Sequence, residues 1–320
     1  MDILVFSPQG DRRAADAADL PALLASPDVT VWVDMTGPTE ADQRAMRDVF
    51  RFHPLAIEDT VYHEQRPKVE EYEDHVFVLL NAIDFKTHAL VLREVDIFVG
   101  RNYVVTVHKR EEPAVTEARR RVSSPTRVMP ISASYLLYVV MDSIIDSYLP
   151  IFDVISGVIE DIEDDVLKDA RQQTLARLFQ LKRAMIDLWR VVWPQREILN
   201  NLMHHKLAYI DQDAIQYYLR DVSDHLLWLT DMVNTFRDHL TGITDLYMSA
   251  VSNRLNRVVN RLAVYALVIG VFTVITAFYG MNFVQVWPSW DAPWGAVFVV
   301  GAMAVSTIVL LVLAKRRGWL

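Results

Sequence analysis

The chain has 320 residues, no cysteine and a formal net charge of -9. The length is enough for two modest domains, and the lack of cysteine excludes disulfides, thiolate metal sites and cysteine nucleophiles. The acidic balance argues against a nucleic-acid binder that relies on a basic surface. Hydrophobic residues make up 52% of the chain beside 23% charged residues, so we expect the apolar residues to be gathered in particular segments.

The amino-terminal part alternates β-rich runs with a helical run, which is typical of a mixed α/β domain. Strand composition fills three runs, at 30–35 (TVWVDM), 75–85 (HVFVLLNAIDF) and 94–108 (EVDIFVGRNYVVTVH). A Gly-Arg-Asn turn signal divides the last run into two apolar halves. The run EADQRAMRDVF at 40–50 has the apolar spacing of a helix.

From about residue 131 the chain reads as helical. Apolar residues then recur every three or four positions, at Val222, Leu226, Leu229, Val233, Phe236, Leu240, Ile243, Tyr247, Val251, Leu255, Val258 and Leu262. This is the period of a helix, and one helix from 221 to 279 would be about 90 Å long. A helix of that length is not stable alone, so we expect partners along it, in a bundle or an oligomer.

Two long uncharged segments follow, at 262–280 and at 292–314. Each has the roughly 20 apolar residues that cross a bilayer. The other interpretation is a pair of buried core helices, which would need a core large enough to cover both on all sides. We therefore expect two transmembrane helices at this end of the chain.

Basic residues flank the two segments on their outer sides only. Arg254, Arg257 and Arg261 precede the first segment, and the run 315–317 follows the second. The connecting stretch 283–293 contains no Lys or Arg. The positive-inside rule then places both ends of the chain in the cytoplasm and the connecting stretch outside.

Polar residues mark the first segment at Thr273, Thr276 and Asn282. Polar residues within a membrane usually face a bundle interior or an aqueous path. A threonine also satisfies itself on a carbonyl of its own helix, so each threonine keeps both interpretations. Asn282 carries more weight, because it follows the helix break that Gly280 permits. Two helices cannot enclose a water-filled path, which again favours an oligomer.

The stretch YGMNF at 279–283 resembles the signature of the CorA family of magnesium transporters. Two other stretches resemble the same family, the cytoplasmic motif at 53–80 and the stalk helix at 218–262. A Gly-Met-Asn triplet alone is a weak signal. With the stalk before it and one more span after it, the triplet is highly specific, and the resemblance covers the chain from about residue 45 onward.

The resemblance implies a fold of the α+β membrane class, a pentameric funnel in which the first spans line the pore. Its expected parts are a cytoplasmic α/β domain (1–130), a helical stalk with flanking helices (131–260), a pore-lining transmembrane helix continuous with the stalk (261–282), an external loop (283–293), a second transmembrane helix (294–314) and a basic cytoplasmic tail (315–320).

The resemblance also implies a selectivity filter of Gly280, Met281 and Asn282 at the external mouth. Mg²⁺ gives up its water reluctantly, and a ring of Asn282 amides would hydrogen-bond the hydrated ion without holding it as tightly as carboxylates, since conduction needs weak sites. Leu262 would form a hydrophobic constriction. The implied pore-lining residues are Asn256, Val259, Leu262, Ala266, Gly270 and Thr273, which recur at three or four as one helix face does.

A regulatory metal sensor is implied by the resemblance at Asp84 and Asp221, which would meet across a subunit boundary and bind Mg²⁺ in the closed state. The alternative is that each is a solvated surface carboxylate. The acidic run at 160–165 (EDIEDD) is either a cation reservoir or a solvated helix face.

The implied activity is Mg²⁺ uptake, with Co²⁺ or Ni²⁺ as further cargo. A divalent ion entering a negative interior gains about 4.6 kcal/mol per 100 mV, so no ATP is needed, and no glycine here is followed by the lysine of a Walker A motif. Val259 and Gly270 stand where the family often has methionine, and the loop lacks an acidic stretch. These departures leave open a zinc transporter like the related ZntB group, with proton coupling.

The implied partners are copies of the same chain in a homopentamer, the lipid bilayer and divalent cations, with no nucleic acid. The resemblance places the protein in a bacterial inner membrane with both termini in the cytoplasm. An enzyme is not expected. A receptor or scaffold with a helical stalk is the rival class, and ion flux through the purified protein would separate the two.

Overall fold

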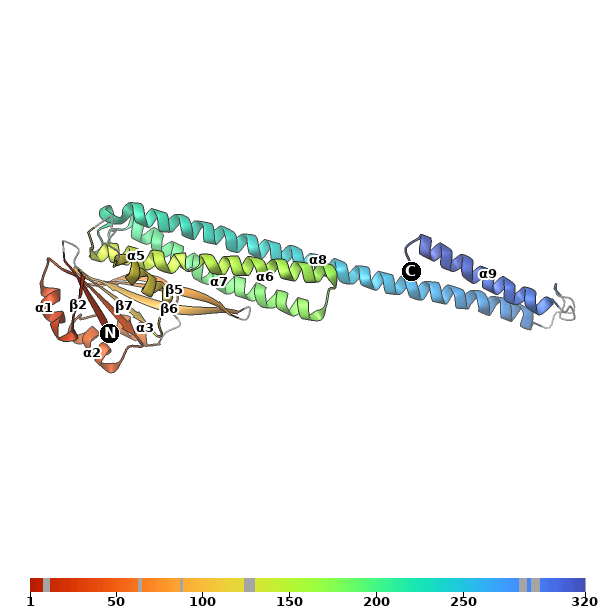
Figure 1. Ribbon diagram of the computed structural model, residues 1–320, viewed down its shortest axis with the longest axis horizontal. Coiled ribbons are helices and arrows are strands. Elements are labelled where there is room, and N and C mark those ends of the chain that lie inside the picture. The colour runs from red at the N-terminus through yellow and green to blue at the C-terminus, as the bar shows by residue number, and fades with distance from the viewer. Residues whose placement is uncertain are drawn as a thin grey trace. The chain divides into compact units, whose positions relative to one another are not determined.

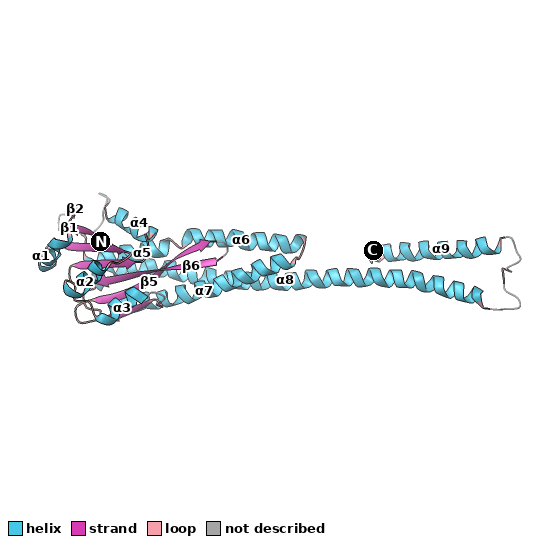
Figure 2. Ribbon diagram, turned by 90° about the horizontal axis from the view of Figure 1, so that it is seen from below, coloured by secondary structure: helices cyan, strands magenta, loops and turns pink. Residues whose placement is uncertain are grey.

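The computed structural model describes residues 1–7, 12–62, 65–86, 89–123, 130–281, 287–288 and 294–319. The chain forms two compact units. One consists of Met1–Asp164 and Gln172–Gly242, and the other of Asp165–Arg171 and Ile243–Leu320. The first unit holds a β-sheet with helices on both faces, and the second is helical (Figures 1 and 2).

The first unit is built on a mixed sheet that has seven strands among the described residues. The strands are β1 (Asp2–Phe6), β2 (Arg12–Ala14), β3 (Thr30–Thr36), β4 (Lys68–Glu71), β5 (Val76–Lys86), β6 (Ala89–Val99) and β7 (Tyr103–His108). Their order is β2-β1-β3-β7-β6-β5-β4. β3 and β7 pair in parallel, and the other neighbouring pairs are antiparallel.

The helices alternate with the strands at first and then follow one another to the end of the chain. They are a short 3-10 helix η1 (Ala17–Asp19), α1 (Leu20–Ala25), α2 (Glu40–Asp48), α3 (Pro54–Tyr62), α4 (Pro113–Val122), α5 (Ala133–Asp146), α6 (Leu149–Lys168), α7 (Gln172–His204), α8 (Gln212–Gly280) and α9 (Gly295–Arg316). The predicted α/β part, the long helix and the apolar carboxyl-terminal helix are thereby confirmed.

The predicted strands correspond to β3, β5 and the β6–β7 pair, although β6 begins at Ala89, before the predicted run at 94–108. The turn predicted between the last two is confirmed, since β6 ends at Val99, β7 begins at Tyr103 and the Gly100 N–H donates to the Tyr103 carbonyl at 3.0 Å. Gly100 has no room for a side chain there, because a Cβ would lie 2.2 Å from the ring of the buried Tyr103. The predicted helix at 40–50 is α2, and Thr39 is its N-cap. The side chain of Asp42 accepts from the backbone N–H of Thr39 at 2.8 Å, and the Thr39 hydroxyl accepts from the N–H of Asp42, which makes a capping box.

The two faces of the sheet are covered by different helices. On one face α1, α2 and α3 enclose a core that includes Leu20, Met46 and Ile57. On the other face α5 packs against β3, β5, β6 and β7, and α7 packs against β4 and β6. A buried polar contact joins this second layer, since the Tyr148 hydroxyl donates to the Asn81 carbonyl of β5 and accepts from Gln195 of α7. The strongly apolar sequence of α5 follows from its place between the sheet and other helices.

α8 is one continuous helix, as the apolar period predicts. Within the first unit its apolar row is buried from Val222 to Leu240. The row keeps its period in the second unit, yet Val251, Leu255 and Leu262 are exposed. The same pattern is therefore covered by protein along the first part of the helix, whereas from Val251 onward its apolar row is exposed among the described residues.

Among the described residues, three helical segments are long and apolar enough to cross a membrane. The first, Ala133–Lys168, has 67% of its most apolar stretch buried within the protein. The corresponding stretches of α8 and α9 are 6% and 0% buried. A helix that the protein covers needs no lipid, whereas an uncovered helix that is apolar all round needs a membrane or further protein. α8 and α9 therefore match the two expected spans.

Candidate functional site

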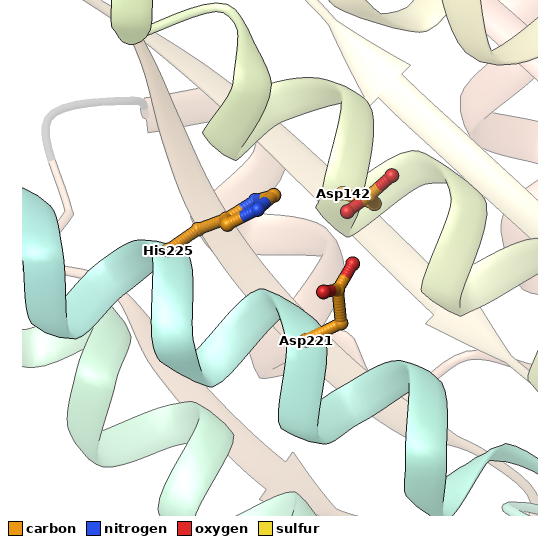
Figure 3. Close-up of side chains that lie close together, drawn as sticks. All are labelled: Asp142, Asp221 and His225. Atoms are coloured by element: carbon orange, nitrogen blue, oxygen red, sulfur yellow. The ribbon is translucent and has the colours of Figure 1, made fainter.

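Three side chains with metal-binding chemistry meet in the first unit: Asp142 of α5, and Asp221 and His225 of α8. One ligand atom from each lies within 4.8 Å of the other two, and the three side chains point toward one another (Figure 3). We call these three residues the metal centre. Carboxylate oxygens suit Mg²⁺, and an imidazole nitrogen also suits Zn²⁺, Co²⁺ and Ni²⁺.

The two helices bring the metal centre together by simple geometry. Asp221 and His225 are four residues apart on α8, so they lie on the same side of the helix. Asp142 projects from α5 within the apolar run YLLYVVMDSII and is buried, whereas His225 is half-buried and Asp221 is exposed. The centre thus has one wall inside the protein and one that is open to solvent.

Two atoms of the metal centre are buried without a hydrogen-bond partner, Oδ1 of Asp142 and Nδ1 of His225. Nδ1 of His225 lies 3.3 Å from Oδ1 of Asp146, which is an ion-pair distance without hydrogen-bond geometry. A buried polar atom without a partner costs about 1–3 kcal/mol, and such atoms are rare in native proteins. A divalent cation between the three side chains would satisfy both atoms, so the residues present fit a cation.

The charges around the centre support the same conclusion. The pKa of Asp146 is raised above its ordinary value, first by burial and then by the negative charge of Asp142, with Asp221 adding to the shift. His225 and Arg121 act in the opposite direction and do not cancel it. A carboxyl whose pKa is raised by neighbouring carboxylates lies where added positive charge is favourable.

Of the predicted sensor pair, Asp221 belongs to the metal centre and Asp84 does not. Asp84 lies on β5, half-buried, and its charge adds to the effect of burial in raising the pKa of Glu112. Glu112 pairs with Arg93 at 3.1 Å. The expected contact between Asp84 and Asp221 crosses a subunit boundary, so it stays a prediction.

Asp142 and His225 escaped the sequence analysis. The signal for His225 was its spacing from Asp221, since a carboxylate and an imidazole at i and i+4 share one helix face. The signal for Asp142 was a carboxylate inside an otherwise apolar helix, because charged residues are almost never buried without a partner. Only the packing of α5 against α8 joins the two signals.

The predicted pore-lining residues share one side of α8. At about 100° per residue, a second row lies on the opposite side and is less exposed, consisting of Val264, Val268, Val271, Ile275 and Tyr279. α9 runs beside α8 in both views (Figures 1 and 2). The side proposed to line a pore is exposed at all six positions, Asn256, Val259, Leu262, Ala266, Gly270 and Thr273.

The polar residues of α8 have local partners. The Thr273 hydroxyl donates to the Ile269 carbonyl at 2.8 Å, and the Thr276 hydroxyl donates to the Phe272 carbonyl at 2.7 Å. Both threonines therefore satisfy their hydroxyl hydrogens on their own helix. Gly280 ends α8, and Met281 follows it with its side chain exposed. Asn282 lies outside the described residues.

Comparison with known proteins shows the family to which the chain belongs. The model of the family described as CorA-like Mg²⁺ transporter protein matches residues 27–316. The chain belongs to the CorA family. This family consists of transporters rather than enzymes.

Two relatives cover most of this CorA chain. The cobalt/magnesium transport protein CorA of Thermotoga maritima is 33% identical over 294 residues, which are 90% of this chain and 83% of that protein. The putative metal ion transporter YfjQ of Bacillus subtilis is 32% identical over 295 residues, 92% of this chain and 91% of that protein.

A solved structure shows that the fold extends over the whole chain. The complete structure of the CorA magnesium transporter of Methanocaldococcus jannaschii matches with a TM-score of 0.83 at 21% identity. The match covers 100% of this chain and 99% of that chain. This CorA protein therefore has the fold of a full-length transporter of its family, with a soluble α/β part, a long helix and an apolar carboxyl-terminal helix.

Proposed function

We propose that the protein is a divalent-cation channel of the bacterial inner membrane that takes up Mg²⁺, with Co²⁺ and Ni²⁺ as further cargo. In this proposal it forms a homopentameric funnel with both termini in the cytoplasm. The spans lie at 261–282 and 294–314 and are joined by an external loop (283–293), and residues 1–130 and 131–260 form the cytoplasmic part. The membrane potential drives the ion inward.

The division of α8 into two unlike faces carries the proposal. One face holds the less exposed row at Val264, Val268 and Val271, and the opposite face is uncovered. The uncovered face includes Leu262, which is 60% exposed. Helices in a membrane associate through close packing rather than by leaving water, and the face that the described residues leave uncovered is available for packing of further copies around it. Five such helices would then line a path with Leu262 as a constriction that gates by dewetting.

At the outer end of that path we place the filter, Gly280, Met281 and Asn282. α8 ends at Gly280, and the carboxyl end of a helix carries a partial negative charge. Several such ends around an axis attract a cation without any carboxylate. A ring of Asn282 amides would hydrogen-bond the water shell of Mg²⁺ and leave the ion free to move on.

The metal centre supplies regulation in this proposal. Cytoplasmic Mg²⁺ bound at Asp142, Asp221 and His225 would favour the closed state, because a ligand shifts an equilibrium toward the state that it binds better. One site at its dissociation constant contributes about 0.4 kcal/mol, so five sites contribute about 2 kcal/mol. Asp84 of a neighbouring copy would join Asp221 at the subunit boundary.

A zinc transporter with proton coupling is the second candidate function. The imidazole of His225 in the metal centre favours it, because imidazole is a good zinc ligand. The zinc transport protein ZntB of Yersinia enterocolitica is 21% identical over 87% of this chain and 84% of that protein. The lower identity makes this the weaker candidate.

Ion flux into vesicles that contain the purified full-length protein tests the proposal. We expect Mg²⁺ flux that rises with an inside-negative potential and ignores a pH gradient. Asn282→Ala should abolish most of this flux while the pentamer still assembles, because the change removes the amide ring and leaves α8 intact. Wild-type flux through a correctly assembled Asn282→Ala protein would contradict the filter, and Zn²⁺ flux that requires a pH gradient would favour the second candidate.

A further inference from the structure

Arg121 of α4 contacts the buried member of the metal centre, Asp142. Its guanidinium donates to Oδ2 of Asp142 at 2.6 Å and to the Ser143 hydroxyl at 3.3 Å, and it lies 3.9 Å from Oδ2 of Asp146. Asp142 therefore has one oxygen on the arginine and one oxygen, Oδ1, without a partner. A single buried carboxylate joins a fixed positive charge to the place where a cation would bind.

We propose that Arg121 is the resident counter-charge of the metal centre, which holds Asp142 in the metal-free protein and lowers the affinity of the centre for its cation. The inference rests on the proposed regulatory function of the centre. It makes Arg121 a positioning residue that sets the Mg²⁺ concentration at which the centre fills.

The charge balance supports this role. Asp142, Asp146 and Asp221 are three carboxylates within one cluster, and Arg121 is the guanidinium that pairs with two of them. Three carboxylates and one guanidinium leave two more negative than positive charges, which one divalent cation would neutralise. Without the arginine the excess would be larger, so a cation would bind more tightly and the metal-free protein would be less stable.

The position of Arg121 is fixed by the rest of α4. Arg119, two residues earlier, bonds to Asp34 of β3 at 3.3 Å and to Asp2 of β1 at 2.9 Å, which ties the helix to the sheet. Arg120 projects to the surface and pairs with Glu117 on α4 itself. α4 is therefore held on the sheet by Arg119, and a substitution that removes the charge of Arg121 leaves those contacts in place.

The direction in which the Mg²⁺ affinity changes when Arg121 loses its charge separates two roles of the arginine, a counter-charge and a residue that only holds Asp142 in place. Arg121→Gln keeps a hydrogen-bond donor for Asp142 and removes the charge. We expect Mg²⁺ to bind about tenfold more tightly, the effect of one unit charge about 6 Å from a divalent ion in water. If Arg121 only held Asp142 in place, the same variant would bind Mg²⁺ more weakly, because the ligand would be less ordered.

The measurement is calorimetric titration of Mg²⁺ into the purified full-length protein, together with the unfolding temperature in EDTA. Arg121→Gln should bind more tightly and unfold at a lower temperature in EDTA, and the gain in affinity should shrink at high salt. Arg121→Lys keeps the charge and should bind as the wild type does. Arg120→Gln, on the same helix, is the matched control and should change the affinity by less than about twofold, because an exposed pair contributes little.

Each outcome decides one question. Unchanged or weaker binding by Arg121→Gln, or weaker binding by Arg121→Lys, would overturn the role of the arginine. If Arg121→Gln does not fold without metal, the Mg²⁺ affinity of Arg121→Lys alone decides the question: wild-type affinity supports the role of the charge, and weaker binding overturns it. If Asp142→Asn and His225→Gln both bind Mg²⁺ with the affinity of the wild type, the metal centre itself would be overturned.

Discussion

Arg119 and Arg121 stand two residues apart on α4, yet the polar clusters that they serve are completed to different degrees. Arg119 contacts Asp34, which lies in a buried group on the sheet where Trp32, Thr106 and His108 each have a hydrogen-bond partner within the group. Arg121 contacts Asp142, which belongs to a group with two buried atoms that lack hydrogen-bond partners. A complete buried polar group stabilises a fold, whereas buried atoms without partners call for an explanation, and a bound cation is one that fits two carboxylates and an imidazole.

The complete group, which we call the sheet cluster, consists of Asp34, Thr106, His108 and Trp32. Oδ1 of Asp34 accepts from the Thr106 hydroxyl at 2.5 Å and from Nε2 of His108 at 2.9 Å. Trp32 donates to the Thr106 hydroxyl at 3.1 Å. Nδ1 of His108 lies 2.6 Å from the Arg110 carbonyl. Since both partners of the imidazole are acceptors, the contacts favour the doubly protonated, cationic form of His108.

The pKa values of the sheet cluster follow from these contacts. Burial lowers the pKa of His108, but the hydrogen bond and charge of Asp34 outweigh it and the net shift is upward. Burial raises the pKa of Asp34, but His108, Thr106 and Arg119 outweigh it and the net shift is downward. The pair therefore stabilises its own charged state, in contrast to Asp146 beside the metal centre, whose charged state is disfavoured.

Breaking the sheet cluster should have the largest effect on stability. Asp34→Asn leaves His108 as a buried cation without its counter-charge, and such changes cost about 3–5 kcal/mol. Denaturant unfolding of the full-length protein should show this loss equally in Mg²⁺ and in EDTA. Asp28→Asn replaces an exposed carboxylate and is the matched control. A loss of stability that appears only without Mg²⁺ would mean that the sheet cluster depends on metal as the metal centre does.

Breaking the metal centre should have a smaller effect that depends on metal. Asp142→Asn removes a ligand, relieves the repulsion among the carboxylates and weakens the 2.6 Å pair with Arg121. Because that arginine is partly exposed, we expect a loss of stability in EDTA that is smaller than the loss in Asp34→Asn. The wild type should gain about 2.7 kcal/mol at Mg²⁺ about 100 times its dissociation constant, and the variant should lose that gain. Unfolding curves with and without Mg²⁺ measure both quantities. An equal response of variant and wild type to Mg²⁺ would remove Asp142 from the site.

The dependence on pH should be smaller still, on the order of 1 kcal/mol. The raised pKa of His108 means that its contribution is fully present below the unfolded value of about 6.5 and is lost as pH rises through the folded value. The lowered pKa of Asp34 means that its contribution is present above about 3.9 and is lost as pH falls through the folded value. The stability difference between wild type and His108→Gln should therefore shrink on the alkaline side. A difference that grows with pH would show that His108 is neutral in the folded protein.

The sequence predicted the elements whose signals are local. The strands β3, β5 and β7, the helix α2, the continuity of α8 and the two apolar segments all follow from composition and period within one stretch of chain. β2 and β4 were missed because three or four residues carry too little period, and β1 was missed because its buried run DILVF lies at the chain start without the alternation that marks a strand. The apolar period of α8 also does not predict at which residue its apolar row passes from buried to exposed.

The metal centre was only half predictable. Asp221 was expected from the family resemblance, but Asp142 and His225 become ligands only when α5 packs against α8. The sheet cluster shows the same limit. Asp34 and His108 read as ordinary strand residues, and the parallel pairing of β3 with β7, with Asp34 opposite Thr106, joins them. Contacts between distant segments decide which polar residues work together.

Anomalous X-ray scattering from crystals of the full-length protein grown with Mn²⁺, a stand-in for Mg²⁺, would show directly whether the incomplete cluster holds a cation. We expect a peak bounded by Asp142, Asp221 and His225 in the wild type, its loss in Asp142→Asn, and no peak at the sheet cluster in either protein. A wild-type map with Mn²⁺ at other sites and none between these three side chains, or a peak that survives in Asp142→Asn, would contradict the metal centre.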